Sequence, residues 1–139
     1  MKFRAICKSK IHRATVTSTD INYVGSIGID STLLEQADII PGEKVCIWNV
    51  NNGERVETYA IPAPAGSGQI TINGAAARKF QRLDKVIIVA FVLTDEPIAP
   101  KIILVNDDNA FVKYLVDNCP GDDINATALT GPVDEFVAG

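Results

Sequence analysis

Cysteines and long apolar runs are scarce in this sequence, and both scarcities exclude classes of protein. Cys7, Cys46 and Cys119 are the only cysteines among 139 residues, and their odd number and wide spacing fit neither a disulfide framework nor a paired metal motif. The longest apolar run, residues 86–93, is far shorter than the ~20 residues that a membrane-spanning helix needs. We therefore expect no metal and no membrane association.

An export signal and a strong basic charge are lacking as well. Charged residues recur within the first ten positions, before an apolar segment of signal-peptide length can form, so we expect a reduced, cytoplasmic protein. The formal net charge is −4, and residues 106–139 hold seven of the 17 acidic side chains but one of the 13 basic ones. The first 105 residues therefore carry +2. Such a body suits a small anionic substrate better than a nucleic acid, which needs a basic stripe.

What is present is a series of short strands. With 47% hydrophobic and 22% charged residues, the chain fits one globular domain with a sizeable core. Asn51-Asn52-Gly53 is a strong hairpin signal, and little helix is expected beyond a brief one capped by Asp30 or Ser31 and a helix start after Asn73. The pattern predicts strands at residues 2–17, 27–29, 44–50, 54–61, 69–72, 86–92 and 102–105, with a turn at 18–20. This mainly-β pattern is typical of a compact β-barrel.

The composition changes after residue 105. We expect a barrel domain at residues 1–105 and an acidic C-terminal extension, partly docked or disordered, at residues 106–139. The apolar cluster at residues 111–116 predicts a short helix docked on the barrel. Beyond Pro120 the composition predicts a loosely held or disordered tail.

The pair Gly25-Ser26 has a reactivity that an ordinary turn does not need. Because glycine leaves its carbonyl uncrowded, the following serine hydroxyl can attack that carbonyl if the fold strains the peptide and supplies a proton acceptor. The amide becomes an ester, and loss of the Ser26 α-proton then cuts the chain. Hydrolysis of the new end leaves an N-terminal pyruvoyl group. Taken alone the pair is typical of a loop, so this hypothesis depends on the rest of the chain.

Strand alternation places polar residues on common faces. Lys10 and His12 are two apart, and so are successive members of the set Arg55, Glu57 and Tyr59, so each set points to one side of its strand. Both sets are typical of a half-exposed surface. In a concave site, however, the arginine and tyrosine supply a carboxylate clamp and a proton donor. The start of the second helix offers backbone N–H groups that can bind a carboxylate.

Several blocks of the sequence together resemble the pyruvoyl-dependent aspartate 1-decarboxylase family. They occur in order from residue 2 to about residue 91 and do not cover roughly the last thirty residues. The blocks are Lys10-Ile11-His12-Arg13, Tyr23-Val24-Gly25-Ser26, Ile47-Trp48-Asn49-Val50, Asn52-Gly53, Arg55, Thr58-Tyr59-Ala60-Ile61 and Ile72-Asn73-Gly74-Ala75-Ala76-Ala77.

The resemblance implies a double-psi β-barrel that assembles as a homotetramer of cleaved chains, with active sites between subunits. It implies a carboxy-lyase that converts L-aspartate to β-alanine and carbon dioxide for pantothenate and coenzyme A synthesis. The cofactor would be a pyruvoyl group made from Ser26, which forms a Schiff base with the substrate amine and takes up electrons as a pyridoxal ring would. Pyridoxal phosphate and metal are then not expected, and the need for an accessory maturation factor stays open.

The family's residue roles carry over position by position. Ser26 becomes the pyruvoyl group, Thr58 assists the cleavage, and Tyr59 reprotonates the product. Arg55 and Lys10 hold the substrate carboxylates. Further residues that line the site for substrate are His12, Trp48, Asn73, Gly74, Ala75 and Ala76.

Two alternatives stay open on sequence grounds. A barrel that keeps the family core but never cleaves would serve as a scaffold or binding module, and a cleaved barrel could act on another small amino acid. Arg55 favours a substrate with an acidic side chain. Glu57 does not fit this site as well, because an ion pair between Glu57 and Arg55 would weaken the hypothesis that Arg55 binds a substrate carboxylate. We expect Glu57 to lean towards solvent.

Overall fold

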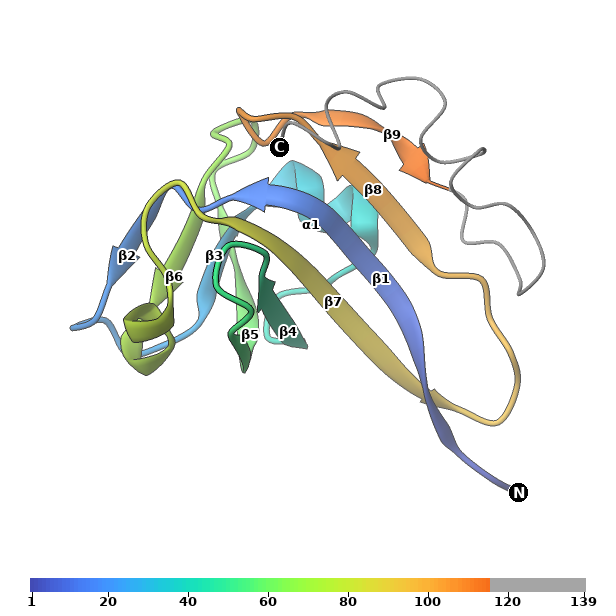
Figure 1. The fold of residues 1–139 in the computed structure, drawn as a ribbon. Helices are drawn as coiled ribbons and strands as arrows, with labels where there is room; N and C mark the ends of the chain where they lie inside the picture. The colour runs from blue at the N-terminus through green and yellow to red at the C-terminus, as the bar shows by residue number, and fades with distance from the viewer. Residues whose placement is uncertain (116–139) are drawn as a thin grey trace.

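The computed structural model describes residues 1–115, which form one mixed sheet and two short helices (Figure 1). The elements are β1 (Arg4–Thr15), β2 (Ser18–Asp20), β3 (Ile27–Asp30), α1 (Ser31–Ala37), β4 (Lys44–Asn49), β5 (Arg55–Ala63), β6 (Ile70–Asn73), the 3-10 helix η1 (Gly74–Lys79), β7 (Lys85–Thr94), β8 (Lys101–Val105) and β9 (Phe111–Leu115). The strand order is β2-β6-β3-β5-β4-β7-β1-β8-β9. The mainly-β double-psi barrel that the sequence predicted is confirmed.

The core is built from one face of each strand. Ile11, Ile88 and Ile47 lie side by side on β1, β7 and β4, and all three are fully buried. Burial of an isoleucine side chain stabilises the fold by about 1.5–3 kcal/mol, so this row helps to fix the register of the three strands. The alternate side chains of these strands necessarily point away from the core, and the polar residues predicted for the site are among them.

The long strands β1 and β7 dominate the view in Figure 1 and pair antiparallel from one end to the other. Strand β7 lies between β4 and β1 and is not at an edge of the sheet. No helix within residues 1–115 is long and apolar enough to cross a membrane.

Asp30 fixes the beginning of α1, as the sequence predicted. Its carboxylate accepts the backbone N–H of Thr32 at 2.9 Å, and also those of Gly66 at 3.0 Å and Gly68 at 2.9 Å. Burial disfavours the charged form, but the backbone N–H groups of Gly68, Thr32 and Gly66 outweigh it and lower the pKa of the Asp30 carboxyl. One buried carboxylate thus ties the helix start to the loop before β6.

Two sequence expectations were wrong. Ser18–Asp20 is not a turn but strand β2, because Thr17 bonds to Ile70 through both its backbone N–H and its hydroxyl and leads the chain into parallel pairing with β6. Phe111–Leu115 is not a helix but strand β9, whose alternating burial matches antiparallel pairing with β8. In both cases pairing with another strand, β6 for β2 and β8 for β9, decided the structure. The prediction for the chain beyond Pro120 lies outside the described residues.

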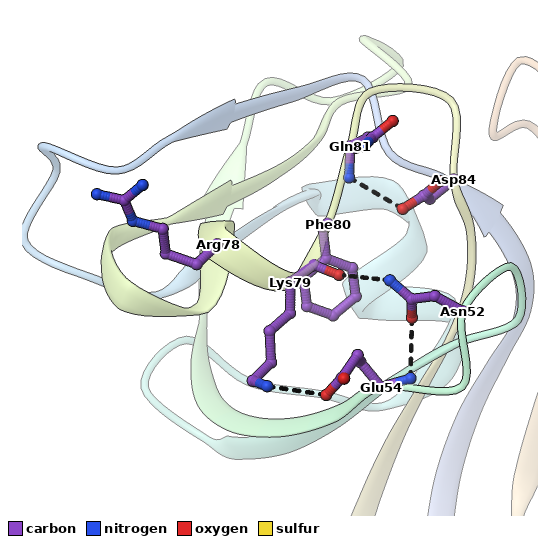
Figure 2. A pocket seen from close by; sticks show the side chains of 7 residues that line it. All are labelled: Asn52, Glu54, Arg78, Lys79, Phe80, Gln81 and Asp84. Carbon is purple, nitrogen blue, oxygen red and sulfur yellow. Dashed lines mark hydrogen bonds and ion pairs between the residues drawn. The ribbon is translucent and has the colours of Figure 1, made fainter.

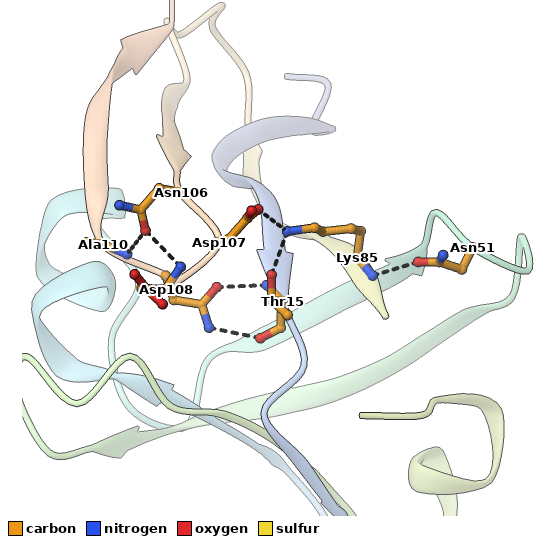
Figure 3. A network of polar contacts seen from close by, with 8 residues as sticks. Thr15, Asn51, Lys85, Asn106, Asp107, Asp108 and Ala110 are labelled. Carbon is orange, nitrogen blue, oxygen red and sulfur yellow. Dashed lines mark hydrogen bonds and ion pairs between the residues drawn. The ribbon is translucent and has the colours of Figure 1, made fainter. Parts of the chain in front are cut away.

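The turn between β8 and β9 is held on the barrel by Asn109. Figure 3 shows this turn, with Asn106, Asp107 and Asp108 labelled, beside Thr15 of β1. Asn109 is 1% exposed and has a φ of +60°. Its side chain accepts the N–H of Thr15 at 2.7 Å and donates to the carbonyls of Thr15 at 2.8 Å and Gly68 at 2.7 Å. Close by, the Lys85 ammonium donates to the Thr15 hydroxyl at 2.7 Å and pairs with Asp107 at 2.6 Å. The turn therefore belongs to the packed barrel and is not an appendage.

Replacing Asn109 tests this attachment. We expect Asn109→Ala to lower the free energy of unfolding by about 2–4 kcal/mol, because it removes three buried hydrogen bonds and strains alanine at positive φ. Asn109→Gly should recover up to ~1 kcal/mol of that loss, since glycine tolerates positive φ. Urea unfolding at fixed protein concentration measures both, with the exposed Asp108→Ala as control. A midpoint for Asn109→Ala equal to that of the control would contradict the assignment.

Candidate active site

The backbone is distorted at the bond that the sequence singled out. Gly25 has a φ of +127° and Ser26 a φ of +90°, a value that residues with a side chain rarely adopt. Ser26 is 1% exposed, whereas Val24 two residues earlier is 92% exposed. The chain thus passes from an open loop into a buried, strained peptide just before β3. Strain at a single peptide is a recurrent property of reactive sites.

Asn73 at the end of β6 holds Ser26 in place. Strands β3 and β6 pair antiparallel, with Ile27 opposite Ile72, and beyond this pair the Asn73 N–H donates to the Ser26 carbonyl at 3.0 Å. The Asn73 side-chain amide donates to the Ser26 hydroxyl oxygen at 3.2 Å. Both contacts are buried, so the position of the hydroxyl is set by the sheet and not by solvent.

Gly74 allows the turn after β6 to approach the strained bond. Gly74 has a φ of +71°, and a Cβ atom at this position would lie 2.8 Å from the Gly25 Cα and 3.2 Å from the Tyr23 carbonyl oxygen. Such distances are below van der Waals contact. Only a residue without a side chain fits here while Gly25 keeps its place.

Strand β5 runs along the other side of β3. Ile27 pairs with Ala60 in parallel register, and extending that register back by two residues brings Thr58 to the level of Gly25 and Tyr59 to the level of Ser26. The predicted alternation along β5 is present, because Tyr59 is 42% exposed while Thr58 is half-buried. The two neighbours therefore serve opposite faces of the strand at the height of the reactive bond.

A second group of predicted site residues lies further along the sheet. The Arg55 guanidinium stacks on the Trp48 ring at 4.4 Å from its centroid. Lys10 and His12 lie on β1, which is separated from β5 by β4 and β7, or about 14 Å at the usual strand spacing. Burial, with the positive charges of Lys10 and Arg13, lowers the pKa of His12 to about 4, so its imidazole is neutral at pH 7. Lys10 and His12 are thus not on a strand next to the Ser26 peptide in the sheet order.

The Glu57 side chain is 60% exposed, in agreement with the expectation that it leans towards solvent. Its carboxylate pairs with the Lys44 ammonium at 2.7 Å, and both side chains are mostly exposed. Sequence reasoning missed Lys44, although the hairpin signal at Asn51-Asn52-Gly53 contains the information. Counting outward from that turn pairs Trp48 with Arg55 and therefore Lys44 with Tyr59.

The helix η1 links these two groups of residues. Figure 2 shows the end of η1, where the Asn52 side chain reaches the Lys79 carbonyl. At its start lie Gly74 and then Ala75, which is exposed, and Ala76, which is half-buried. At its end the Lys79 carbonyl accepts the side-chain amides of Asn52 at 3.0 Å and Asn49 at 3.2 Å, beside a cleft of about 440 Å³. Carbonyls at a helix end need such outside partners. The hairpin between Trp48 and Arg55 is thereby tied to the segment that contacts Gly25.

Residues 1–115 contain no group of three or more histidine, cysteine, aspartate or glutamate side chains that could hold a metal ion. The site itself holds a buried hydroxyl next to a strained peptide, with amide, hydroxyl and phenol groups at the same level.

Comparison with known proteins gives concordant results. The family model described as aspartate decarboxylase matches residues 1–112. A protein of Carboxydothermus hydrogenoformans is 54% identical over 115 residues, covering 80% of this chain and 91% of its own length. One from Moorella thermoacetica is 50% identical, covering 86% and 96%, and one from Caldicellulosiruptor saccharolyticus is 56% identical, covering 78% and 88%. All three bear the name aspartate 1-decarboxylase.

The contact between Gly74 and Gly25 yields a prediction about chain cleavage. In Gly74→Ala the new methyl group displaces Gly25, so cleavage after that residue should slow by about 10²-fold, the usual effect of a displacement near 1 Å. The matched control is Gly66→Ala, since Gly66 has a similar φ of +78° but a Cβ there meets nothing within 4 Å. Mass spectrometry of the uncut fraction over time measures both. Equal rates in the two variants would mean that the contact does not position the bond.

Proposed function

Because this chain belongs to the aspartate decarboxylase family, we propose that it removes the α-carboxylate of L-aspartate to give β-alanine and carbon dioxide. The product supplies pantothenate and coenzyme A synthesis, and the enzyme works in the cytoplasm. The observation that carries the proposal is the peptide between Gly25 and Ser26, which is buried, strained and held by Asn73.

The chain makes its own reactive group. The Ser26 hydroxyl attacks the Gly25 carbonyl, and the peptide nitrogen leaves as the ester forms. Thr58, at the level of Gly25, donates a hydrogen bond to the oxygen that gains charge. Removal of the Ser26 α-proton then expels the Gly25 carboxylate and leaves a dehydroalanine at position 26. Water hydrolyses this dehydroalanine, its nitrogen departs as ammonia, and a ketone remains at position 26.

The residues around Ser26 fit a pyruvoyl group. Asn73 offers a side-chain N–H within 3.2 Å of the Ser26 oxygen, and an N–H donor suits a ketone oxygen as well as a hydroxyl. When present, the ketone binds the substrate amine covalently and accepts the electrons released with carbon dioxide. Pyridoxal phosphate is then not needed.

The other residues bind the substrate and return the proton. Arg55, held flat against Trp48, presents its planar guanidinium to the carboxylate that aspartate keeps. Tyr59, exposed at the level of Ser26, donates a proton to the carbon that has lost its carboxylate. His12 is neutral and lines the pocket without adding charge.

A homotetramer completes the site. Lys10 and His12 lie on β1, three strands from β5 in the sheet order, and we place them in the site of a neighbouring subunit. Exposed apolar residues on the same outer region, Phe91 and Leu93 on β7, support an interface there.

Intact mass is the direct test of self-cleavage. The purified protein should give a chain of 25 residues and one of 114, the larger with a ketone that reacts with hydrazines. Ser26→Ala has no hydroxyl and should give only the uncut chain. A wild-type chain that stayed whole on prolonged warming would support the scaffold alternative instead.

Substitutions at Thr58 and Tyr59 distinguish formation of the pyruvoyl group from its use in decarboxylation. Thr58→Ala should leave mostly uncut chain, because the cleavage intermediate loses a hydrogen-bond donor. Tyr59→Phe should cleave normally yet decarboxylate aspartate about 10²–10⁴-fold more slowly, the usual contribution of general acid catalysis. Cleavage is followed by mass and turnover by β-alanine release. A fully active Tyr59→Phe enzyme would show that another group returns the proton.

A further inference from the structure

Lys44 and Glu57 form an ion pair beside the proposed substrate groups. Antiparallel pairing of β4 and β5 sets Lys44 opposite Tyr59, Cys46 opposite Glu57, and Trp48 opposite Arg55. Directly opposed residues share a face of the sheet, and so do residues two apart on one strand. Arg55, Glu57 and Tyr59 therefore share one face, with Lys44 reaching diagonally across to Glu57 at 2.7 Å.

An unneutralised Glu57 would oppose substrate binding. It lies two residues from both Arg55 and Tyr59, or about 7 Å along a strand. Aspartate brings two carboxylates to this face. A like unit charge about 7 Å away weakens binding by about 3-fold in bulk water and by about 50-fold at the effective dielectric of ~20 found near protein surfaces.

The stability of the barrel does not explain the pair. The Lys44 and Glu57 side chains are 73% and 60% exposed, and ion pairs of this kind add little to folding free energy. The hydrogen bond and charge of Glu57 raise the pKa of Lys44, so Lys44 carries its positive charge at neutral pH.

We propose that Lys44 is a positioning residue for substrate binding: it neutralises Glu57 and holds its carboxylate away from Arg55, so that the guanidinium is free for the carboxylate of a dianionic amino acid. The inference rests on the proposed function, because it assumes that Arg55 binds the substrate.

A double-mutant cycle on the cleaved enzyme tests this role. At low ionic strength, Lys44→Met should raise KM for aspartate by about 3- to 50-fold and leave kcat within 2-fold, since the pair acts on binding. The inhibition constant of succinate, a dicarboxylate without the amine, should rise by a similar factor. Lys44→Arg should keep KM near the wild-type value. Adding Glu57→Gln to Lys44→Met should restore KM, because the repelling charge is gone.

Lys79→Met is the matched control. It breaks the ion pair between Lys79 and Glu54, which spans 2.8 Å between side chains that are 48% and 45% exposed. Glu54 directly precedes Arg55, but neighbouring residues of a strand point to opposite faces, so its charge lies on the η1 side and KM should stay unchanged. Raising the salt concentration to about 0.5 M should shrink the Lys44→Met effect by screening.

An unchanged KM in Lys44→Met, or a KM that Glu57→Gln fails to restore, would overturn the inference. A loss confined to kcat would also overturn it, since Lys44 would then act on the chemical step. The proposed function fails separately, if the wild-type cleaved chain does not release β-alanine from aspartate.

Discussion

The two hydrogen bonds from Asn73 to Ser26 are the constraint on which the site depends. They join the end of β6 to the residue before β3, and they hold at positive φ a residue that would relax to an ordinary conformation if it were left in a loop. The surrounding sheet keeps this peptide in its distorted conformation. Because Ile27, which follows Ser26, and Ile72, which precedes Asn73, face each other and are buried in the core, the distorted peptide cannot relax without disturbing buried apolar contacts.

The barrel separates two tasks by strand alternation. Inward side chains such as Ile47 and Ile88 supply the apolar burial that makes the strands rigid. Outward side chains of β4 and β5, including Trp48 and Tyr59, are then available to a substrate at fixed spacing. A site assembled in this way is as precise as the register of its strands, and register is difficult to shift because a slip of one residue would exchange core and surface.

Local sequence signals predicted those parts of the fold that depend on neighbouring residues. The cap at Asp30, the hairpin at residues 51–53 and the alternation along β5 all follow from a few adjacent side chains. Strand β2 was mistaken for a turn because its partner, β6, is distant in the sequence. Strand β9 was mistaken for a helix because its pairing with β8 depends on a turn that the buried Asn109 holds in place. The positive φ of Ser26 was also beyond local signals, since it depends on the pairing of β3 with β6. The register that brings Lys44 near Glu57, in contrast, could have been counted from the hairpin at residues 51–53.

The peptide before Ser26 can be cut only once. On the proposed route, each polypeptide converts its own backbone into one electrophile, which stays attached and cannot be exchanged with a pool of free coenzyme. The number of working sites then follows the rate of protein synthesis and not the supply of a vitamin. If the pyruvoyl group is reduced or trapped, its chain loses activity permanently, and the site can be replaced only by newly synthesised protein.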